Sequence, residues 1–186
     1  MFWTIPNTLT LLRILLIPVL VVGFYAPLEW SRQAAAMIFL VAAVTDWFDG
    51  YLARKLDQST PFGAFLDPVA DKLMVSTALV LLVSSDPQIA VTISAIIIVG
   101  REITISSLRE WMAELGARAT VAVSMLGKLK TTAQMTAITV LLWREPLFGL
   151  PLYEIGLLLL YVAAAMTLWS MVVYLRAAWP ILKGRS

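Results

Sequence analysis

Long apolar stretches separated by short polar links dominate the hydropathy pattern of the chain. Each stretch is long enough for a helix to cross a hydrocarbon core of about 30 Å. The pattern predicts an all-α, polytopic membrane protein with six transmembrane helices, preceded by a short interfacial segment over residues 1–7. The expected helices cover roughly residues 8–26, 33–55, 61–83, 88–113, 127–143 and 152–178.

Local signals mark the ends of two of these helices. Asn7 or Thr8 is expected to cap the first helix, because short polar side chains accept hydrogen bonds from free backbone N–H groups. The third helix is expected to begin at Pro61 behind a Ser59 or Thr60 cap, since proline is favoured in the first helical turn.

The composition agrees with a membrane protein and narrows its chemistry. Hydrophobic residues make up 60% of the 186 residues and charged residues only 14%, well below the quarter or so that is usual in soluble domains. The chain contains neither cysteine nor histidine, which excludes disulfides, thiolate nucleophiles, Cys/His zinc sites and imidazole bases. A net charge of +2 gives no reason to expect nucleic acid as a partner. No repeat or linker divides the chain, so residues 1–186 are predicted to form a single membrane domain.

Basic residues predict the orientation. With six spans, both termini and the links after the second and fourth helices share one side of the membrane. All of the 14 lysines and arginines except Arg32 and Arg144 fall on or near that side. The positive-inside rule therefore places the termini in the cytoplasm.

Four aspartates lie where the second and third predicted helices approach the cytoplasmic side, and ionisable groups at membrane depth usually mark a functional site. Asp46 and Asp49 are three residues apart, and Asp67 and Asp71 are four apart, so each pair lies on one helical face. The short link makes the two helices antiparallel neighbours, and the two pairs are expected to face each other. Because four ionised carboxylates repel one another, we expect one or two hard divalent cations such as Mg²⁺ or Mn²⁺ among them.

Small residues and an arginine accompany the aspartates. Gly50, Ala53 and Gly63 leave room for a bulky anion against the backbone. Arg54 offers a planar, bidentate donor to phosphate oxygens. The stretch is therefore interpreted as a metal and pyrophosphate site.

The pattern Asp46-x2-Asp49-Gly50-x2-Ala53-Arg54-x8-Gly63-x3-Asp67-x3-Asp71 resembles the defining motif of the CDP-alcohol phosphotransferases at every position. Flanking segments resemble the bacterial phosphatidylglycerophosphate synthases within that family. These segments begin at Ile5, Arg101, Leu108 and Gly127. The resemblance implies transfer of a phosphatidyl group from CDP-diacylglycerol to sn-glycerol 3-phosphate in the bacterial cytoplasmic (inner) membrane, with the active site facing the cytoplasm. It also implies a homodimer.

The resemblance further implies a role for each residue of the motif. The four aspartates would hold two metal ions, Mg²⁺ or Mn²⁺, and Asp71 would also be the catalytic base. The site for CDP-diacylglycerol would consist of Asn7, Thr10, Asp49, Gly50, Ala53, Arg54, Gly63 and Asp67.

The phosphate of the second substrate requires cations beside the metal site. The candidates, all near the cytoplasmic ends of the fourth and fifth predicted helices, are Arg101, Arg109, Lys128 and Lys130. Arg101 lies deepest in the apolar sequence and needs a partner there. Glu102 is a candidate to orient one of the arginines. For Arg109 and Lys130, ordinary positive-inside decoration is the competing interpretation.

Three alternatives remain open from the residues themselves. Individual aspartates can form structural ion pairs, for example Asp46 or Asp49 with Arg54, although four at paired helical spacing favour a site. The acceptor alcohol can be inositol phosphate, serine or phosphatidylglycerol. A divalent-cation transporter would use carboxylates in a different way, but the aspartates cluster near one face and no inverted repeat is present.

Overall fold

The structure, a computed structural model, describes residues 4–55, 60–114 and 125–182. At residues 47, 49–54, 125–128 and 180–182 only the helical backbone is described. The described residues form six helices. They are α1 (Ile5–Tyr25), α2 (Ser31–Lys55), α3 (Pro61–Ser85), α4 (Ile89–Glu114), α5 (Met125–Trp143) and α6 (Leu152–Leu182).

The start of α1 differs from the prediction. The helix begins at Ile5, and Thr4 is its cap, with a side chain that accepts a hydrogen bond from the backbone N–H of Asn7 at 3.4 Å. Residues 5–7 therefore belong to the helix and not to a separate interfacial segment. The cap predicted at Asn7 or Thr8 is wrong because Pro6 already stands in the first helical turn, where its missing N–H is tolerated.

The start of α3 agrees with the prediction. Thr60 caps the helix by accepting the backbone N–H of Gly63 at 3.0 Å, and Pro61 is its first residue. Both α1 and α3 continue through an internal proline, Pro18 and Pro68 respectively.

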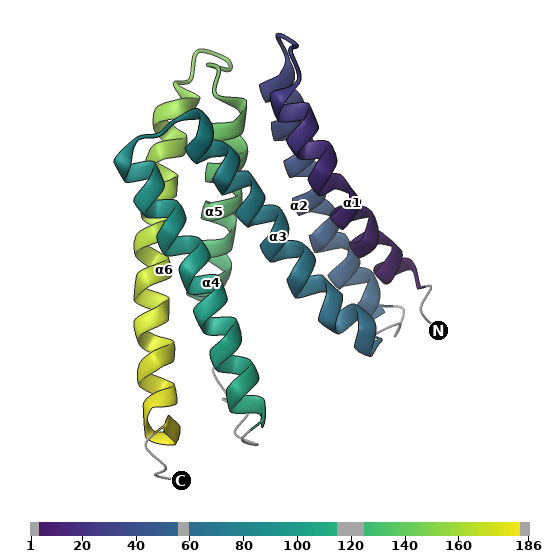
Figure 1. Ribbon diagram of the computed structural model, residues 1–186, viewed down its shortest axis with the longest axis vertical. Coiled ribbons are helices and arrows are strands. Elements are labelled where there is room, and N and C mark those ends of the chain that lie inside the picture. Colours follow the sequence, from purple (N-terminus) through teal and green to yellow (C-terminus); the bar gives the residue numbers. More distant parts are fainter. Residues whose placement is uncertain (1–3, 56–59, 115–124, 183–186) are drawn as a thin grey trace.

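The helices run alternately up and down, so both ends of the chain lie at one end of the molecule (Figure 1). The helices α1 and α2 form one side and α4, α5 and α6 the other, while α3 crosses diagonally between the two groups. The first helix packs against both α2 and α3 more extensively than these two pack against each other. The helices α2 and α3, which follow each other in sequence, are thus held together mainly through their shared contacts with α1.

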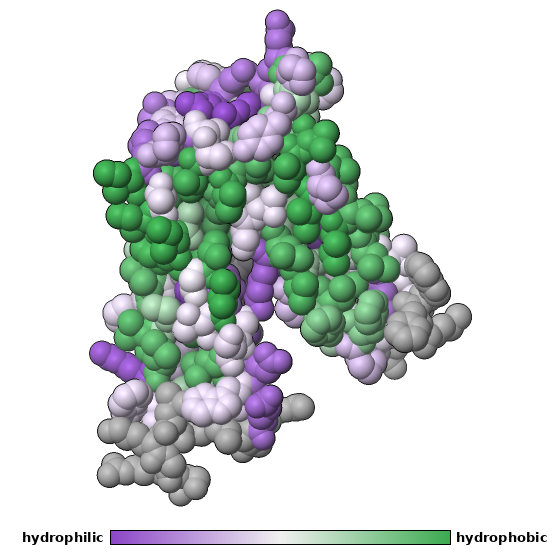
Figure 2. Space-filling model, in the orientation of Figure 1, coloured by the Kyte–Doolittle hydropathy of each residue, from purple (hydrophilic) through white to green (hydrophobic). Residues whose placement is uncertain are grey.

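A core of apolar side chains joins both groups, including Phe39, Leu79, Ile98, Ile138 and Leu160, each without solvent exposure. Within the described part of the chain, three helical segments are long and apolar enough to cross a membrane: Ile5–Tyr25, Ile89–Glu114 and Leu152–Trp179. Hydrophobic side chains cover the flanks of the molecule (Figure 2). Hydrophilic side chains gather at its ends and in a notch between α3 and α4 that opens toward the chain termini.

Candidate active site

A buried arginine from α1 connects the two predicted aspartate pairs. One Arg13 guanidinium nitrogen, Nη1, donates to Oδ1 of Asp46 on α2, and Nη2 donates to Oδ1 of Asp67 on α3 at 3.0 Å. The Arg13 side chain is only 1% exposed, whereas both carboxylates remain partly accessible. The predicted convergence of α2 and α3 on one site is therefore present, with α1 supplying the link.

Arg13 was not among the predicted site residues. The available signal was an arginine inside the apolar sequence of α1, since a charged group at membrane depth needs a partner and usually has a function. The partners lie 33 and 54 residues away in sequence, so the helical spacing around Arg13 does not identify them. The alternative in which Asp46 or Asp49 pairs with Arg54 involves side chains outside the described residues and stays a prediction.

The start of α3 is attached to α1 beside the aspartates. The Nδ2 amide of Asn7 donates to Oγ1 of Thr60 at 3.0 Å. A Cβ atom added to Gly63 would lie 2.3 Å from Oδ1 of Asn7. The absence of a side chain at Gly63 thus lets α1 and α3 approach closely enough to place their polar groups together.

Thr10 lies on the same buried face of α1 as Asn7 and Arg13. Its hydroxyl donates to the backbone oxygen of Pro6, one turn earlier, at 3.1 Å. The threonine is 3% exposed, and its lone pairs are the part of the side chain still able to accept a hydrogen bond.

A second cluster of charged side chains, on α4 and α5, has one carboxylate between two cations, the reverse of the cluster around Arg13. The Oε1 atom of Glu102 on α4 accepts hydrogen bonds from Arg101 Nη1 at 2.8 Å and from Lys130 Nζ on α5 at 3.0 Å. The side chains of Arg101 and Lys130 are 12% and 7% exposed. The prediction that Glu102 orients an arginine is confirmed, and the same carboxylate also holds the predicted lysine.

Arg109 lies two turns beyond Arg101 on α4 and is exposed. Its Nη2 nitrogen donates to the hydroxyl of Tyr174 on α6 at 2.5 Å. Arg101 reaches the same helix, donating through Nη2 to Oγ of Ser170 at 3.3 Å. No residue of α6 was among the predicted site residues.

Asp71 lies one turn beyond Asp67 on α3, and its charge interacts with groups of both clusters. On one side, its charge interacts with those of Asp46 and Asp67. On the other side it interacts with Glu102, and Lys130 interacts with Asp71 in turn. Because Asp71 interacts with groups of both clusters, the two clusters are treated as one polar region.

Five of the predicted residues lie outside the residues whose side chains are described. They are Asp49, Gly50, Ala53, Arg54 and Lys128. The first four stand on the last part of α2 and the fifth in the first turn of α5, on the backbone that the structure describes.

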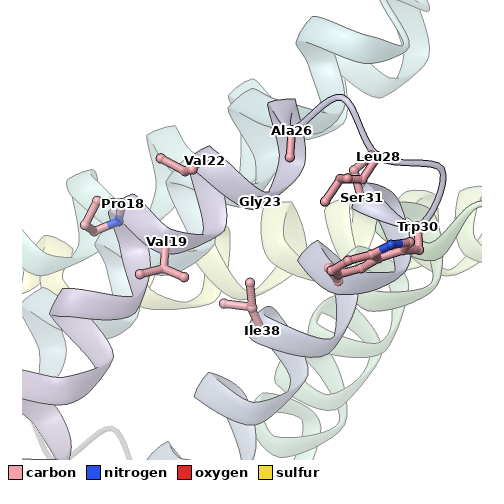
Figure 3. A pocket seen from close by; sticks show the side chains of 10 residues that line it. Pro18, Val19, Val22, Gly23, Ala26, Leu28, Trp30, Ser31 and Ile38 are labelled. Atoms are coloured by element: carbon pink, nitrogen blue, oxygen red, sulfur yellow. The ribbon is translucent and has the colours of Figure 1, made fainter.

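An apolar hollow of about 410 Å³ lies between α1 and α2 at the end away from these clusters. Figure 3 shows side chains from both helices around it, including Val19, Val22 and Ile38, with Trp30 at its edge. Its lining supplies almost no polar atoms, so it cannot bind a nucleotide or a metal ion.

The described residues contain no group of three or more carboxylates placed to hold a metal ion, and the side chain of Asp49 lies outside them. In the cluster of Arg13, Asp46 and Asp67 (the α1–α3 cluster), both carboxylates converge on the arginine, and the charge of Asp71 interacts with theirs. All three offer carboxylate oxygens, the ligands that Mg²⁺ and Mn²⁺ prefer. The α4–α6 cluster, with two cations on one glutamate, is suited to an anion instead.

Comparison with known proteins identifies the family of the chain. Residues 3–169 match the family model of the CDP-alcohol phosphatidyltransferases. The chain is 57% identical over 178 residues to the CDP-diacylglycerol–glycerol-3-phosphate 3-phosphatidyltransferases of Escherichia coli (strain K12) and of Shigella flexneri serotype 5b (strain 8401), and each alignment covers 96% of both chains.

Proposed function

Because the chain belongs to the CDP-alcohol phosphatidyltransferase family, we propose that it transfers the phosphatidyl group of CDP-diacylglycerol to sn-glycerol 3-phosphate. The products are phosphatidylglycerol phosphate and CMP. The names of relatives that match nearly the whole chain support both substrates.

One observation supports the proposal from the structure: the α1–α3 cluster has more carboxylates than cations, and the α4–α6 cluster has more cations than carboxylates. A reaction between a nucleotide-activated lipid and a phosphorylated alcohol brings two phosphate-bearing substrates together. The pyrophosphate needs cations between itself and the carboxylates, and the phosphate of the acceptor needs a positively charged pocket of its own. The two clusters provide these complementary environments side by side.

In this proposal Asp46, Asp49, Asp67 and Asp71 hold Mg²⁺ or Mn²⁺. When bound there, such an ion would supply positive charge against the pyrophosphate. Arg13 keeps Asp46 and Asp67 on the same side of the site. Gly63 and Asn7 keep α3 against α1, so that the lipid nucleotide meets a fixed surface; Gly50, Ala53, Arg54 and Thr10 complete its binding site.

Asp71 is proposed as the base. The free hydroxyl oxygen of glycerol 3-phosphate forms a bond to the lipid-bearing phosphorus, the bond from this phosphorus to the oxygen of CMP breaks, and the hydroxyl proton passes to the Asp71 carboxylate. A base within hydrogen-bond reach of the hydroxyl can act without a strongly raised proton affinity. Arg101, Arg109, Lys128 and Lys130 bind the phosphate of the acceptor and hold its hydroxyl in line.

We further propose that all six helices span the inner membrane of a bacterium, with both termini and the active site facing the cytoplasm. The alternating helix directions, the shared position of the termini and the basic residues on that side support this topology. The homodimer implied by the family resemblance is part of the same proposal, and cross-linking in native membranes tests it.

The decisive experiment is an acceptor panel. Purified full-length protein is mixed with CDP-diacylglycerol, Mg²⁺ or Mn²⁺ and one acceptor at a time, and CMP release is measured. Release should require the metal and be greatest with sn-glycerol 3-phosphate, compared with inositol phosphate, serine and phosphatidylglycerol. A stronger response to another acceptor contradicts the choice of alcohol. Metal flux through proteoliposomes without any CMP release supports a transporter instead.

A further inference from the structure

Helix α6 contacts two of the arginines that are proposed to bind the acceptor phosphate. The Tyr174 hydroxyl accepts a hydrogen bond from Nη2 of Arg109 at 2.5 Å. The centroid of its ring lies 5.0 Å from Cζ of Arg109 and 5.8 Å from Cζ of Arg101. Ser170, one turn earlier on α6, accepts from Arg101 at 3.3 Å. A single aromatic ring is thus shared by two guanidinium groups from α4.

The contact with Tyr174 restricts the positions of the two arginine side chains and does not neutralise their charge. Two arginines repel each other, and each has a long side chain with considerable rotamer freedom. A tyrosine face attracts cations within about 6 Å, and the hydroxyl adds a directional acceptor. Tyr174 can therefore keep both guanidinium groups on the same side of α4 without adding a negative charge to that of Glu102, which already pairs with Arg101.

Arg109 is exposed, and this exposure indicates that its contact with Tyr174 serves to position the arginine and not to pack it. An exposed guanidinium is already hydrated and does not need a partner to avoid a desolvation cost. Holding it against Tyr174 instead restricts its conformations. That restriction is useful where a ligand must find the cation already in place.

We propose that Tyr174 is a positioning residue that presents Arg101 and Arg109 together to the phosphate of the acceptor, and so favours a phosphorylated alcohol over an unphosphorylated one. This inference rests on the proposed function. Tyr174 itself need not touch the substrate, because its effect passes through the two arginines.

The first test compares Tyr174→Leu, which removes the ring and the hydroxyl, with Tyr174→Phe, which removes only the hydroxyl. The KM for sn-glycerol 3-phosphate should rise about tenfold in the leucine variant and about threefold in the phenylalanine variant, as expected for loss of a cation–π contact and a hydrogen bond. The KM for CDP-diacylglycerol should stay within about twofold, because these arginines face the other substrate. The matched control is Tyr161→Leu, on the same helix and outside both clusters, which should leave both KM values unchanged.

The second test asks whether Tyr174 acts through Arg109. In an Arg109→Ala background, Tyr174→Leu should raise the KM for sn-glycerol 3-phosphate clearly less than in the wild-type background, since residues in contact are not additive. Equal increases in both backgrounds, or an unchanged KM with a lower thermal midpoint, would show a purely structural role and overturn the inference. If the leucine variant does not fold, the phenylalanine variant decides by the same criterion.

The two proposals fail in different ways. A wild-type protein that releases no CMP with sn-glycerol 3-phosphate contradicts the proposed function, and with it the role of Tyr174. An active wild type whose KM for this acceptor does not respond to Tyr174→Phe or Tyr174→Leu contradicts only the inference.

Discussion

The two halves of the polar region use opposite arrangements of charge. In the α1–α3 half, the buried Arg13 lies between two carboxylates, Asp46 and Asp67. In the α4–α6 half, the carboxylate of Glu102 lies between two cations, Arg101 and Lys130. Each half therefore contains one internal counter-ion that connects different helices.

Neither cluster is electrically balanced by its internal counter-ion. The α1–α3 half keeps an excess of negative charge, to which Asp71 adds, and the α4–α6 half keeps an excess of positive charge. Excess charge attracts ions of the opposite sign. We therefore expect the counter-ion to orient each cluster, and the excess charge to decide whether a cation or an anion binds there.

Asp71→Asn should have the largest effect, because it changes the group that interacts with both halves. Loss of the base is expected to reduce kcat by about 10³-fold, within the usual range for a general base. Asparagine keeps the size of the side chain, so the protein should still bind CDP-diacylglycerol. Single-turnover CMP release and equilibrium binding of the lipid nucleotide measure the two effects separately.

The control for Asp71→Asn is Asp86→Asn, the same change at the other end of α3, where Asp86 accepts a hydrogen bond from Tyr153. Its turnover should stay within a few-fold of wild type. Near-normal turnover of Asp71→Asn, with metal and substrate still bound, would remove Asp71 from the role of base.

Arg13→Ala should have the second-largest effect, because it removes the counter-ion of the α1–α3 half. Asp46 and Asp67 would then repel each other at the site, although their partial exposure to solvent makes the loss smaller than for a fully buried ion pair. We expect kcat/KM to fall about 100-fold, with a lower midpoint of thermal unfolding in detergent. Arg176→Ala, which removes an exposed arginine from α6, should change neither quantity. A stable and active Arg13→Ala variant would mean that the carboxylates do not depend on α1.

Features encoded locally could be predicted from the sequence. Hydropathy predicted six helices in the right order, because apolar length is a property of each segment, and Thr60 with Pro61 marked the start of α3. The adjacency of Arg101 and Glu102 was enough to predict that the glutamate orients an arginine. These predictions required no knowledge of which helices pack together.

Features that depend on distant residues could not be predicted. Asn7 looked like a helix cap, yet its side chain contacts Thr60, 53 residues later. Arg13 finds its partners on two other helices, and Tyr174 contacts α4 from the far end of the chain. In each case the side chain is an ordinary part of its own helix, and only the packing of α1 on α3 or of α6 on α4 reveals its partner.

Arg101→Ala tests the α4–α6 half alone. Removing this cation should raise the KM for sn-glycerol 3-phosphate about 30-fold, as expected for loss of a charge-assisted contact to phosphate. The KM for CDP-diacylglycerol should change by less than about threefold, since the acidic cluster keeps its own counter-ion. Steady-state kinetics with each substrate varied in turn makes the measurement, and Arg144→Ala, an exposed cation at the opposite end, is the control. Equal effects on both KM values would show that the two halves do not divide the substrates.

Gly63→Ala should have the smallest effect and is confined to the α1–α3 half. The new Cβ would lie 2.3 Å from Oδ1 of Asn7, so the buried Asn7 side chain must shift and weaken its hydrogen bond to Thr60, and overpacking of this kind costs about 1–3 kcal/mol. We expect a lower midpoint of thermal unfolding and about a threefold higher KM for CDP-diacylglycerol, with an unchanged KM for glycerol 3-phosphate. The matched control is Gly100→Ala on α4, where a Cβ meets nothing within 4 Å and should stabilise the helix by up to about 1 kcal/mol. If the two alanine variants behave alike, the close approach of α1 and α3 does not position the acidic cluster.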